Sequence, residues 1–333
     1  MNDMPDETLL LTRSDVAALL AIDDYIDTVE RAFRLYGEGK TEAPGILGVH
    51  ARDGGFHIKA GVLDLERSFF AAKVNANFPN NAKRFGLPLI QGVIVLADAE
   101  NGSPLAVMDS MEITVQRTGA ATAVAAKYLA RADSKTLTIC GCGNQGEVSL
   151  RALSRIFALE NAFVYDIDGA QAKRFASNLS KELGFRVEPV DEFARAVRQS
   201  DVVVTCTPST RYYLDREYVQ PGTFVAAVGA DSETKQELDP TLLAQNKTVV
   251  DMLEQCAVIG ELHHALDSDL MPKEQVHAEL GQVIAGTKPG RVSPEEIIVF
   301  DSTGMALQDV IAAASVYEKA LLNNVGGRIS FGK

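Results

Sequence analysis

The spacing of apolar residues divides the chain into two patterns. Between residues 45 and 108, short apolar runs alternate with turn-forming pieces rich in glycine, proline and asparagine, which is typical of antiparallel strands. Two helical patterns precede this region, one opened by Thr12 and Asp15 at a helix-capping spacing and one over residues 23–37. These patterns predict a small module that combines helices with a mostly antiparallel sheet.

The second pattern begins near Ser134, where apolar strands and amphipathic helices start to alternate. Some of these strands, such as VVVTC and FVAAV, are continuous apolar runs, as expected for parallel strands covered on both faces. A helical pattern over residues 113–130 leads into this region, and another over residues 306–322 follows its last strand. We therefore predict a doubly wound α/β domain, after which the chain could return to the first module.

Composition limits the partners and the location. A chain of 333 residues is longer than one comfortable core, so two domains are expected. Its net charge of -13 disfavours binding to nucleic acid and to anionic membranes. The N-terminus carries acids where a signal peptide would carry positive charge, and no apolar stretch is long enough to span a bilayer. We expect a cytoplasmic protein with no membrane or nucleic-acid partner.

The cysteines and histidines show no metal-binding pattern. Four cysteines are too few for a disulfide framework in a chain of this length, and Cys140 and Cys142 lack a second Cys or His pair at metal spacing. The five histidines show no such pattern either. We expect small buried thiols and no bound metal.

Three glycines follow the apolar run TLTIC at the spacing of a dinucleotide-binding turn. Gly141 would allow a tight turn, Gly143 would let the backbone approach a pyrophosphate, and Gly146 would permit close helix–strand packing. The next helix would offer free N–H groups to the phosphates. A corner that binds nothing is the alternative, but strand, helix and a following acid are all in register. The predicted cofactor-binding residues of the turn are Gly141, Gly143, Asn144, Gln145 and Gly146.

The following acid is Asp166, near the end of the next apolar run and about twenty residues beyond Gly146. An acid at this place accepts hydrogen bonds from the adenosine ribose hydroxyls and repels a 2′-phosphate. The sequence therefore predicts NAD rather than NADP as the cofactor, a preference that one neighbouring basic residue can shift.

Three cationic residues near the first module could serve an anionic substrate. Lys59 and Lys73 lie inside apolar runs, where a lysine is costly unless something pairs with it, and Arg117 lies in a helical pattern. Together they would suit the carboxylate of an amino acid, which arginine can bind through two hydrogen bonds. The alternative is that Lys59 and Lys73 point to the solvent face of the sheet, and the residues alone leave both possibilities open.

Seven segments resemble the ornithine cyclodeaminase and mu-crystallin family, which also includes alanine dehydrogenases, ketimine reductases and iminosuccinate reductases. The segments follow one another in family order over nearly the whole chain, a combination far more specific than the glycine turn alone. They are KVNANFPNNAKRFGLP, ENGSPLAVMDSMEITVQRTGAATAVAAKYLAR, the glycine turn, TCTPST, VGADSETKQELDP, IGELHHAL and FDSTGMALQDV.

The resemblance implies a homodimer of two-domain subunits. A smaller α+β substrate-binding and dimerisation domain would comprise residues 1–115 and be completed by residues 306–333. An NAD-binding Rossmann domain with a doubly wound parallel sheet would comprise residues 116–305.

The resemblance also assigns roles to site residues. Lys73 and Arg117 would hold the substrate carboxylate, with Lys59 as a further substrate-binding candidate. Asp231 would exchange a proton at the substrate nitrogen, so Lys73 and Asp231 are the predicted catalytic residues; helix capping is the alternative for Asp231. Further residues predicted to border the cofactor are Thr207, Ser209 and Ser302, with an ordinary polar turn as the alternative for Thr207 and Ser209.

Two other family segments have open alternatives. Asp301, Ser302 and Gly304 would face the nicotinamide, or their segment FDSTG would be a strand-to-helix turn capped by Ser302 or Thr303. Glu261 and His263 in GELHHAL could equally be surface residues of a helix.

One segment departs from the family pattern. Many members carry an arginine shortly after the proline of the segment that matches EAPGILGVH, and this arginine contacts the substrate carboxylate. Here Pro44 is followed by GILG, so the arginine is missing. Lys59 could compensate, and the loss weakens a straightforward assignment of ornithine as the substrate.

The shared chemistry of the family is hydride transfer between C4 of the nicotinamide and the carbon that bears the substrate nitrogen. We expect an NAD(H)-dependent imine reductase or amino-acid dehydrogenase that acts on a small amino or imino acid. A cyclodeaminase that uses NAD catalytically on ornithine or lysine is the alternative enzyme. A dinucleotide-binding protein like mu-crystallin is the alternative of another class, and the retained Lys73, Arg117 and Asp231 argue against it.

Overall fold

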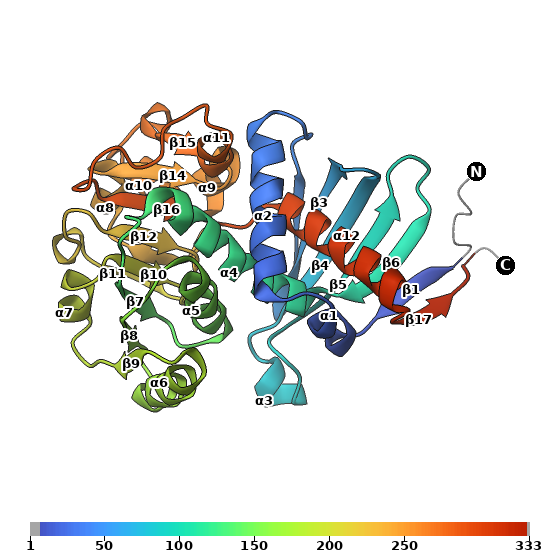
Figure 1. Cartoon of the computed structure of the whole chain (residues 1–333), viewed down its shortest axis with the longest axis horizontal. Coiled ribbons are helices and arrows are strands. Elements are labelled where there is room, and N and C mark those ends of the chain that lie inside the picture. The colour runs from blue at the N-terminus through green and yellow to red at the C-terminus, as the bar shows by residue number, and fades with distance from the viewer. Residues whose placement is uncertain (1–6, 332–333) are drawn as a thin grey trace. The chain divides into compact units, whose positions relative to one another are not determined.

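The computed structural model describes residues 7–331 and folds the chain into two compact units (Figure 1). Unit 1 is formed by the chain up to Arg117 and from Met305 onward, and unit 2 by Thr118–Gly304. Residues 1–6 and 332–333 of the expected first domain lie outside the described residues. The roles expected for the two domains, substrate binding with dimerisation and NAD binding, stay predictions.

Unit 1 contains a seven-stranded sheet. Its strands are β1 (Thr8–Leu11), β2 (Gly45–Ala51), β3 (Gly54–Asp64), β4 (Ser68–Asn77), β5 (Ile90–Asp98), β6 (Pro104–Asp109) and β17 (Gly327–Ile329). The order β17-β1-β6-β5-β4-β3-β2 contains an antiparallel meander from β2 to β6, as the sequence predicts. The sequence patterns did not indicate β1 and β17, which extend this meander at the β6 edge, β1 parallel to β6.

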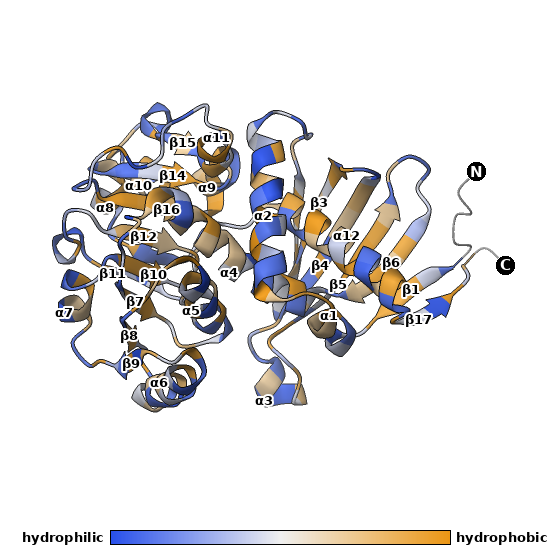
Figure 2. Cartoon of the chain, in the orientation of Figure 1, coloured by the Kyte–Doolittle hydropathy of each residue, from blue (hydrophilic) through white to orange (hydrophobic). Residues whose placement is uncertain are grey.

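The helices of unit 1 are α1 (Arg13–Leu19), α2 (Ile22–Gly37), α3 (Asn81–Phe85) and α12 (Ala306–Asn323). The predicted cap of α1 is confirmed, because the Thr12 side chain accepts a hydrogen bond from the backbone N–H of Asp15. The helix α12 packs against β3 and β4, and α2 packs on α12. Being covered on several sides, α12 is apolar around most of its circumference, whereas α2 turns a hydrophilic face outward (Figure 2).

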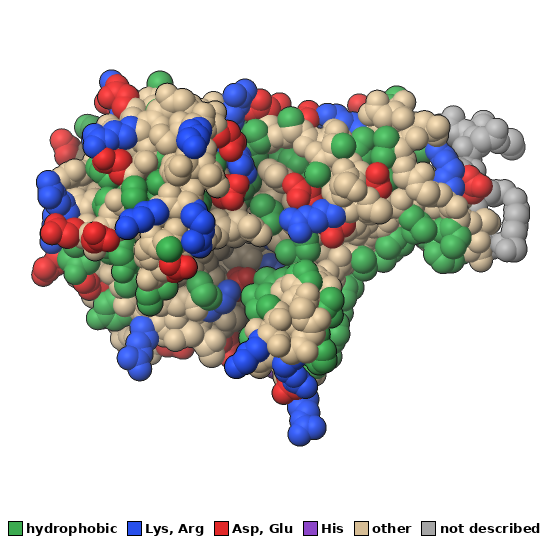
Figure 3. All heavy atoms as spheres, turned by 90° about the horizontal axis from the view of Figure 1, so that it is seen from below, with side chains coloured by type: hydrophobic (Ala, Val, Ile, Leu, Met, Phe, Trp, Pro, Cys, Tyr) green, Lys and Arg blue, Asp and Glu red, His purple; other side chains and the backbone are tan. Residues whose placement is uncertain are grey.

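The two faces of this sheet differ in their cover. On β4, Phe69, Ala71 and Lys73 are buried on the face that α12 covers, and Phe70 and Ala72 point to the other face. By register, a set of exposed large apolar side chains shares that second face, and Figure 3 shows hydrophobic side chains gathered along unit 1 on the right of the view. The set is Leu10, Leu47, Val49, Phe56, Val62, Val93 and Ile329.

Unit 2 contains an eight-stranded parallel sheet. Its strands are β7 (Thr136–Cys140), β8 (Asn161–Tyr165), β9 (Arg186–Pro189), β10 (Val202–Thr205), β12 (Phe224–Ala227), β14 (Lys247–Val250), β15 (Ala278–Glu279) and β16 (Ile298–Asp301). In the order β15-β14-β16-β12-β10-β7-β8-β9, the chain runs outward from β7 to β9 and then returns to β10 on the other side of β7. This is the Rossmann arrangement, so the predicted fold class is confirmed. Its switch point lies between β7 and β10, where such sheets bind ligands at the carboxyl ends of the strands.

Helices and short strands complete unit 2. The helix α4 (Ser110–Leu129) begins in unit 1 and continues into unit 2. The others are α5 (Asn144–Ile156), α6 (Gly169–Leu183), α7 (Phe193–Arg198), α8 (Pro240–Ala244), α9 (Leu253–Ile259), α10 (Glu261–Asp267) and α11 (Leu280–Ile284), with 3-10 turns at Arg216–Tyr218 and Lys273–Gln275. A separate pair joins β11 (Thr210–Leu214) to β13 (Gln236–Leu238). Within residues 7–331, the helices are all too short or too polar to cross a membrane.

Candidate functional site

The glycine turn joins β7 to α5 at the switch point of unit 2. Gly141 has a φ of +103°, and a Cβ there would stand 2.9 Å from the carbonyl oxygen of Cys206. A Cβ on Gly146 would stand 2.1 Å from the carbonyl oxygen of Gly141. Both positions therefore require glycine, one for the backbone conformation and one for close packing of α5 on the turn. Gly143 has no atom within 4 Å of an added Cβ, so its backbone faces open space.

The N-terminus of α5 has the properties of a phosphate-binding site. Its N-cap is Gly143, which supplies no side-chain cap, and Asn144 is exposed beside it. The Oε1 atom of Gln145 is buried without a hydrogen-bond partner. The first N–H groups of the helix thus face open space at the positive end of the helix dipole. These residues fit the pyrophosphate of a dinucleotide.

Asp166 lies one residue beyond β8 and is fixed beside the turn. Its Oδ2 accepts a hydrogen bond of 2.8 Å from the N–H of Cys142, and its Oδ1 accepts one of 2.9 Å from the N–H of Asp168. Each carboxylate oxygen retains further acceptor capacity, which is what the two hydroxyls of an adenosine ribose require. Burial and the Asp166 carboxylate raise the pKa of the Cys142 thiol to about 12, so no thiolate competes with a phosphate here.

A buried carboxylate links the loops that follow β10 and β12. Glu237 accepts hydrogen bonds from the N–H of Thr207 at 2.6 Å and from its hydroxyl at 2.7 Å. The same side chain accepts from the hydroxyl of Tyr213 at 2.8 Å and from the N–H of Gly229 at 3.0 Å. Burial raises the pKa of Glu237. The structure therefore places Thr207 in this internal network, and Ser209 donates to the carbonyl of Arg211; their role beside a cofactor stays a prediction.

Glu261 and His263 are buried, so the interpretation as surface residues of a helix is wrong. Glu261 is 1% exposed and accepts hydrogen bonds from the N–H groups of Glu237 and Leu238. Nδ1 of His263 lies 2.6 Å from the carbonyl oxygen of Gly260. GELHHAL therefore belongs to the core of unit 2, where the carboxylate of Glu261 holds the backbone of β13, the strand that carries Glu237.

Asp231 lies two residues beyond Gly229 in the loop after β12. Its side chain is 58% exposed, and its Oδ1 lies 2.5 Å from Nζ of Lys235. The alternative role as a helix cap is wrong, because the following segment leads into β13 and not into a helix. The structure thus presents a surface carboxylate held by a neighbouring ammonium.

The segment after β16 is organised by Asp251. Its carboxylate accepts hydrogen bonds from the hydroxyl of Ser302 at 3.0 Å and from the N–H of Gly304 at 2.5 Å. Asp301 is fully buried, where burial raises its pKa to about 7, and it accepts from the N–H of Leu262. The N-cap of α12 is Met305, so the interpretation of Ser302 or Thr303 as its cap is wrong.

Unit 1 brings Lys73 and Arg117 together around one carboxylate. Nζ of Lys73 lies 2.7 Å from Oδ2 of Asp309, and Nε of Arg117 donates to Oδ1 of Asp309 at 3.2 Å. Nη1 of Arg117 donates to Oε1 of Gln308 at 3.0 Å. All four side chains are buried, with Lys73 only 3% exposed. The alternative that Lys73 points to the solvent face is therefore wrong.

Lys59 is directly opposite Lys73 in the register of β3 and β4, so both side chains belong to the same face of the sheet. Lys59 is half-buried and adds positive charge to the cluster. The pKa of Lys73 is lowered to about 7: burial is the main cause, the positive charges of Arg117 and Lys59 contribute to the shift, and Asp309 opposes it.

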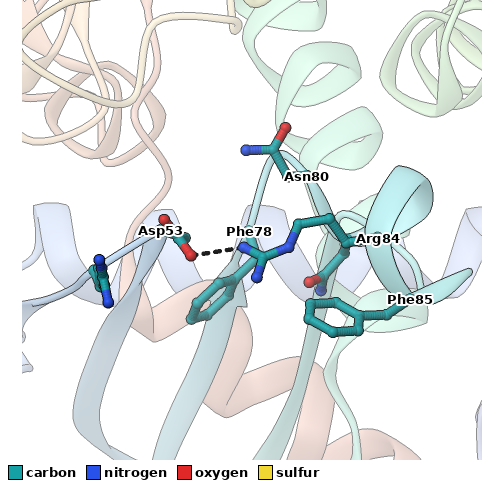
Figure 4. A pocket seen from close by; sticks show the side chains of 7 residues that line it. Asp53, Phe78, Asn80, Arg84 and Phe85 are labelled. Carbon is teal, nitrogen blue, oxygen red and sulfur yellow. Dashed lines mark hydrogen bonds and ion pairs between the residues drawn. The ribbon is translucent and has the colours of Figure 1, made fainter.

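A surface pocket of about 240 Å³ lies elsewhere in unit 1 (Figure 4). Nη1 of Arg84 lies 2.7 Å from Oδ2 of Asp53 across it, and Phe78 and Phe85 flank this ion pair. None of the site residues predicted from the sequence lines this pocket.

Several site residues were missed by sequence reasoning. Glu237 and Lys235 lie in the segment TKQELDP, and Asp309 lies in MALQDV. The available signal for Asp309 was a charged residue inside an apolar helical run, the same signal that singled out Lys73. For the metal prediction, the described residues contain no group of three His, Cys, Asp or Glu side chains that could hold an ion, and the four cysteines are free thiols.

A Rossmann unit with a dinucleotide-type turn, joined to an α+β unit that buries paired cations, defines a class of two-unit dinucleotide-binding proteins. The profile of the ornithine cyclodeaminase/mu-crystallin family matches residues 6–324, and the chain belongs to this family.

Individual relatives match almost the whole chain. The alanine dehydrogenase of Archaeoglobus fulgidus is 41% identical over 326 residues, which cover 98% of this chain and 99% of that protein. The structure of an archaeal alanine dehydrogenase dimer with bound NAD has a TM-score of 0.93 at 42% identity and covers 98% of this chain and 99% of its own. The Δ1-pyrroline-2-carboxylate reductase of Thermococcus litoralis, in complex with NADH and L-proline, has a TM-score of 0.91 at 35% identity, with coverages of 97% and 100%.

Proposed function

We propose that this chain is an NAD(H)-dependent oxidoreductase that interconverts a small carboxylate-bearing imine and its L-amino acid. Relatives that span nearly the whole chain are named as an alanine dehydrogenase and a pyrroline-2-carboxylate reductase. This chain retains the family's glycine turn, its two cations Lys73 and Arg117, and Asp231.

The observation that carries the proposal is the buried cluster of unit 1. Lys73 and Arg117 are two cations that share the single carboxylate of Asp309, and Lys59 adds a further positive charge on the same face. A buried excess of positive charge is unfavourable unless an anion joins it. The carboxylate of an amino or imino acid is an anion of suitable size and shape, since arginine binds it through parallel hydrogen bonds.

Each residue then has a defined task. Lys73 and Arg117 bind the substrate carboxylate and so orient the carbon next to it. Asp231 exchanges a proton with the substrate nitrogen as general acid and base, and Lys235 holds its carboxylate. NADH, when bound, supplies the hydride.

Unit 2 supplies the cofactor-binding residues. The N–H groups at the start of α5 would hold the pyrophosphate, and the fixed carboxylate of Asp166 would hold the adenosine ribose. The negative charge of Asp166 favours NAD over NADP, because a 2′-phosphate would lie against it.

We also propose that the chain forms a homodimer through unit 1. The face of the sheet opposite α12 exposes the apolar set from Leu10 to Ile329 described above, and apolar side chains gathered on one exposed face mark a protein–protein interface. The archaeal alanine dehydrogenase structure is described as a dimer, which supports a dimer here. The mass of the purified chain, measured by light scattering, tests this proposal.

The first experiment follows NADH absorbance with purified protein against a panel of cyclic imino acids and of 2-oxo acids with ammonium. The panel is repeated with NADPH. We expect NADH oxidation with one class of substrate, which would name that class, and slower oxidation of NADPH.

The variant Asp231→Asn should abolish turnover and leave NADH binding intact, with Glu233→Gln as a neighbouring control. No oxidation with any substrate, together with ammonia release from ornithine or lysine, would replace the proposal by a cyclodeaminase. NADH binding with neither reaction would replace it by a dinucleotide-binding protein.

A further inference from the structure

Asp309 lies in the first turn of α12 and is 1% exposed, between the side chains of Lys73 and Arg117. Its two oxygens serve different cations: Oδ2 lies 2.7 Å from Nζ of Lys73, and Oδ1 accepts from Nε of Arg117 at 3.2 Å. The adjacent Gln308 accepts from Nη1 of the same arginine. One turn of α12 therefore fixes the end groups of both cations.

The position of this turn is itself tightly constrained. The helix α12 packs against β3 and β4, and a Cβ added to Gly61 of β3 would stand 3.1 Å from the side chain of Leu307. A helix held this closely cannot shift to let the carboxylate leave its partners without a loss of core packing.

The charged groups around Lys73 come from three elements. They are Asp309 on α12, Arg117 on α4 and Lys59 on β3, while β5 contributes the apolar Ile94 at the paired position. Asp309 is the single anion in this set. Without it, the ammonium of Lys73 would be buried beside two positive charges, a situation that favours the neutral amine.

The pKa shifts agree with this geometry. Burial lowers the pKa of Lys73 to about 7, and Asp309 opposes the shift. Burial alone would raise the pKa of Asp309, but Lys73 and Arg117 hold it below its ordinary value. Asp309 is thus ionised at neutral pH, where Lys73 is present in both its protonated and its neutral form.

We propose that Asp309 is a positioning residue that keeps Lys73 cationic and holds Lys73 and Arg117 in the arrangement that receives the substrate carboxylate. The inference rests on the proposed function, because it concerns the cations assigned there to the substrate. Asp309 acts through these cations and has no contact with the reacting atoms in this scheme.

The test compares Asp309→Asn with the wild type through kcat/KM for the best substrate of the panel, from about pH 6 to about pH 9. The wild type should lose kcat/KM as pH rises through the pKa of Lys73, near 7. In Asp309→Asn this loss should occur at lower pH, because the pKa of Lys73 is lower. At a pH above the Lys73 pKa of both proteins, kcat/KM of the variant should be about tenfold below that of the wild type for each unit by which the pKa is lowered. Because both proteins use one substrate, the ionisation of the substrate cancels.

Two further variants and one binding measurement make the result specific. Asp309→Glu retains the charge, so its kcat/KM should fall with rising pH near the same pH as in the wild type, even if kcat/KM is lower throughout. Glu318→Gln removes a carboxylate from the exposed side of the same helix and should match the wild type throughout. NADH binding, measured by fluorescence, reports whether unit 2 is folded; if Asp309→Asn does not fold, Asp309→Ser leaves room for water around both cations and carries the same expectation.

A readout without turnover separates this inference from the proposed function. The pH at which thermal stability begins to rise, as neutral Lys73 becomes favoured in the folded chain, should be lower in Asp309→Asn than in the wild type. An inactive wild type with this shift would defeat the proposed function and the substrate role of the cluster, and would leave standing only the part of the inference in which Asp309 keeps Lys73 cationic. The inference would be overturned if kcat/KM of a folded Asp309→Asn fell at the same pH as in the wild type, or were reduced by the same factor at every pH.

Discussion

A Cβ on Gly146 would stand 2.1 Å from the carbonyl oxygen of Gly141, so the start of α5 and the end of β7 approach each other as closely as two backbones can. Gly146→Ala must push α5 away from the turn or distort it. We expect a marked loss of thermal stability and of NADH affinity, because the N–H groups at the helix start move with the helix. Thermal unfolding and NADH fluorescence titration check this prediction.

Gly143→Ala is the matched variant. An added Cβ there meets no atom within 4 Å, so stability should stay close to the wild type. NADH affinity should still fall, because the methyl group would occupy the space through which a pyrophosphate approaches the backbone. Equal stability loss in both variants would contradict the distinct roles assigned to the two glycines.

The charge of Asp166 should set the choice between the two dinucleotides. Asp166→Asn keeps an acceptor for the N–H of Cys142, which Asp166 binds at 2.8 Å; it removes the negative charge and the second oxygen, which accepts from the N–H of Asp168. We expect the ratio of NADPH to NADH affinity to rise by about tenfold or more, which corresponds to about 1.4 kcal/mol of lost repulsion. The dissociation constants of both cofactors, measured by fluorescence, give this ratio.

Asp168→Asn is the control for this variant, because it makes the same charge change two residues further on at the exposed cap of α6. It should leave the ratio unchanged. A ratio that moves equally in both variants would show a general charge effect and no ribose contact.

Glu237 should determine the stability of the loop that carries Asp231. Its carboxylate accepts four hydrogen bonds, two from Thr207, one from Tyr213 and one from Gly229. In Glu237→Gln, an NH2 group replaces one of the two carboxylate oxygens, so it faces hydrogen-bond donors of Thr207, Tyr213 or Gly229. We expect a loss of about 1–3 kcal/mol in the free energy of unfolding, since buried donors lose their acceptor. Urea denaturation measures the change.

Glu233→Gln alters an exposed carboxylate in the same segment and should have almost no effect on the unfolding curve. If Glu237→Gln unfolds at the urea concentration of the wild type, the four contacts do not support the loop as described.

Much of the fold could be predicted because its signals are local. The continuous apolar runs of unit 2 and the glycine turn indicate strand, helix and parallel sheet within a few residues of one another. The strands β1 and β17 carry weaker local signals, and their pairing joins residues from opposite ends of the described chain. Nothing in a short stretch reports such a pairing.

The candidate site divides in the same way. Lys73 could be singled out because a lysine in an apolar strand needs a partner, but its partner Asp309 lies on a helix more than two hundred residues later in the sequence. In the sequence, Glu237 and Asp251 look like ordinary polar residues near apolar runs. Only the fold shows that each accepts hydrogen bonds from separate loops. Buried polar networks depend on three-dimensional proximity, which periodicity does not encode.

The lowered pKa of Lys73 should make stability depend on pH. In the folded chain its pKa is about 7, whereas its ordinary value, which applies to the unfolded chain, is 10.5. Between these two values the unfolded chain binds a proton at Lys73 that the folded chain does not, so stability rises with pH across this window. Lys73→Met has no proton to bind there and should lack this contribution.

We therefore expect the unfolding free energy of the wild type to rise relative to that of Lys73→Met from near pH 7 to near pH 10.5. Chemical denaturation at a series of pH values measures the difference, in which the ordinary lysines cancel because both proteins contain them. Lys83→Met, at an exposed position of α3, should run parallel to the wild type. If the curve of Lys73→Met also runs parallel to the wild type, Lys73 titrates as an ordinary lysine, and the account of its buried cluster with Arg117 and Asp309 fails.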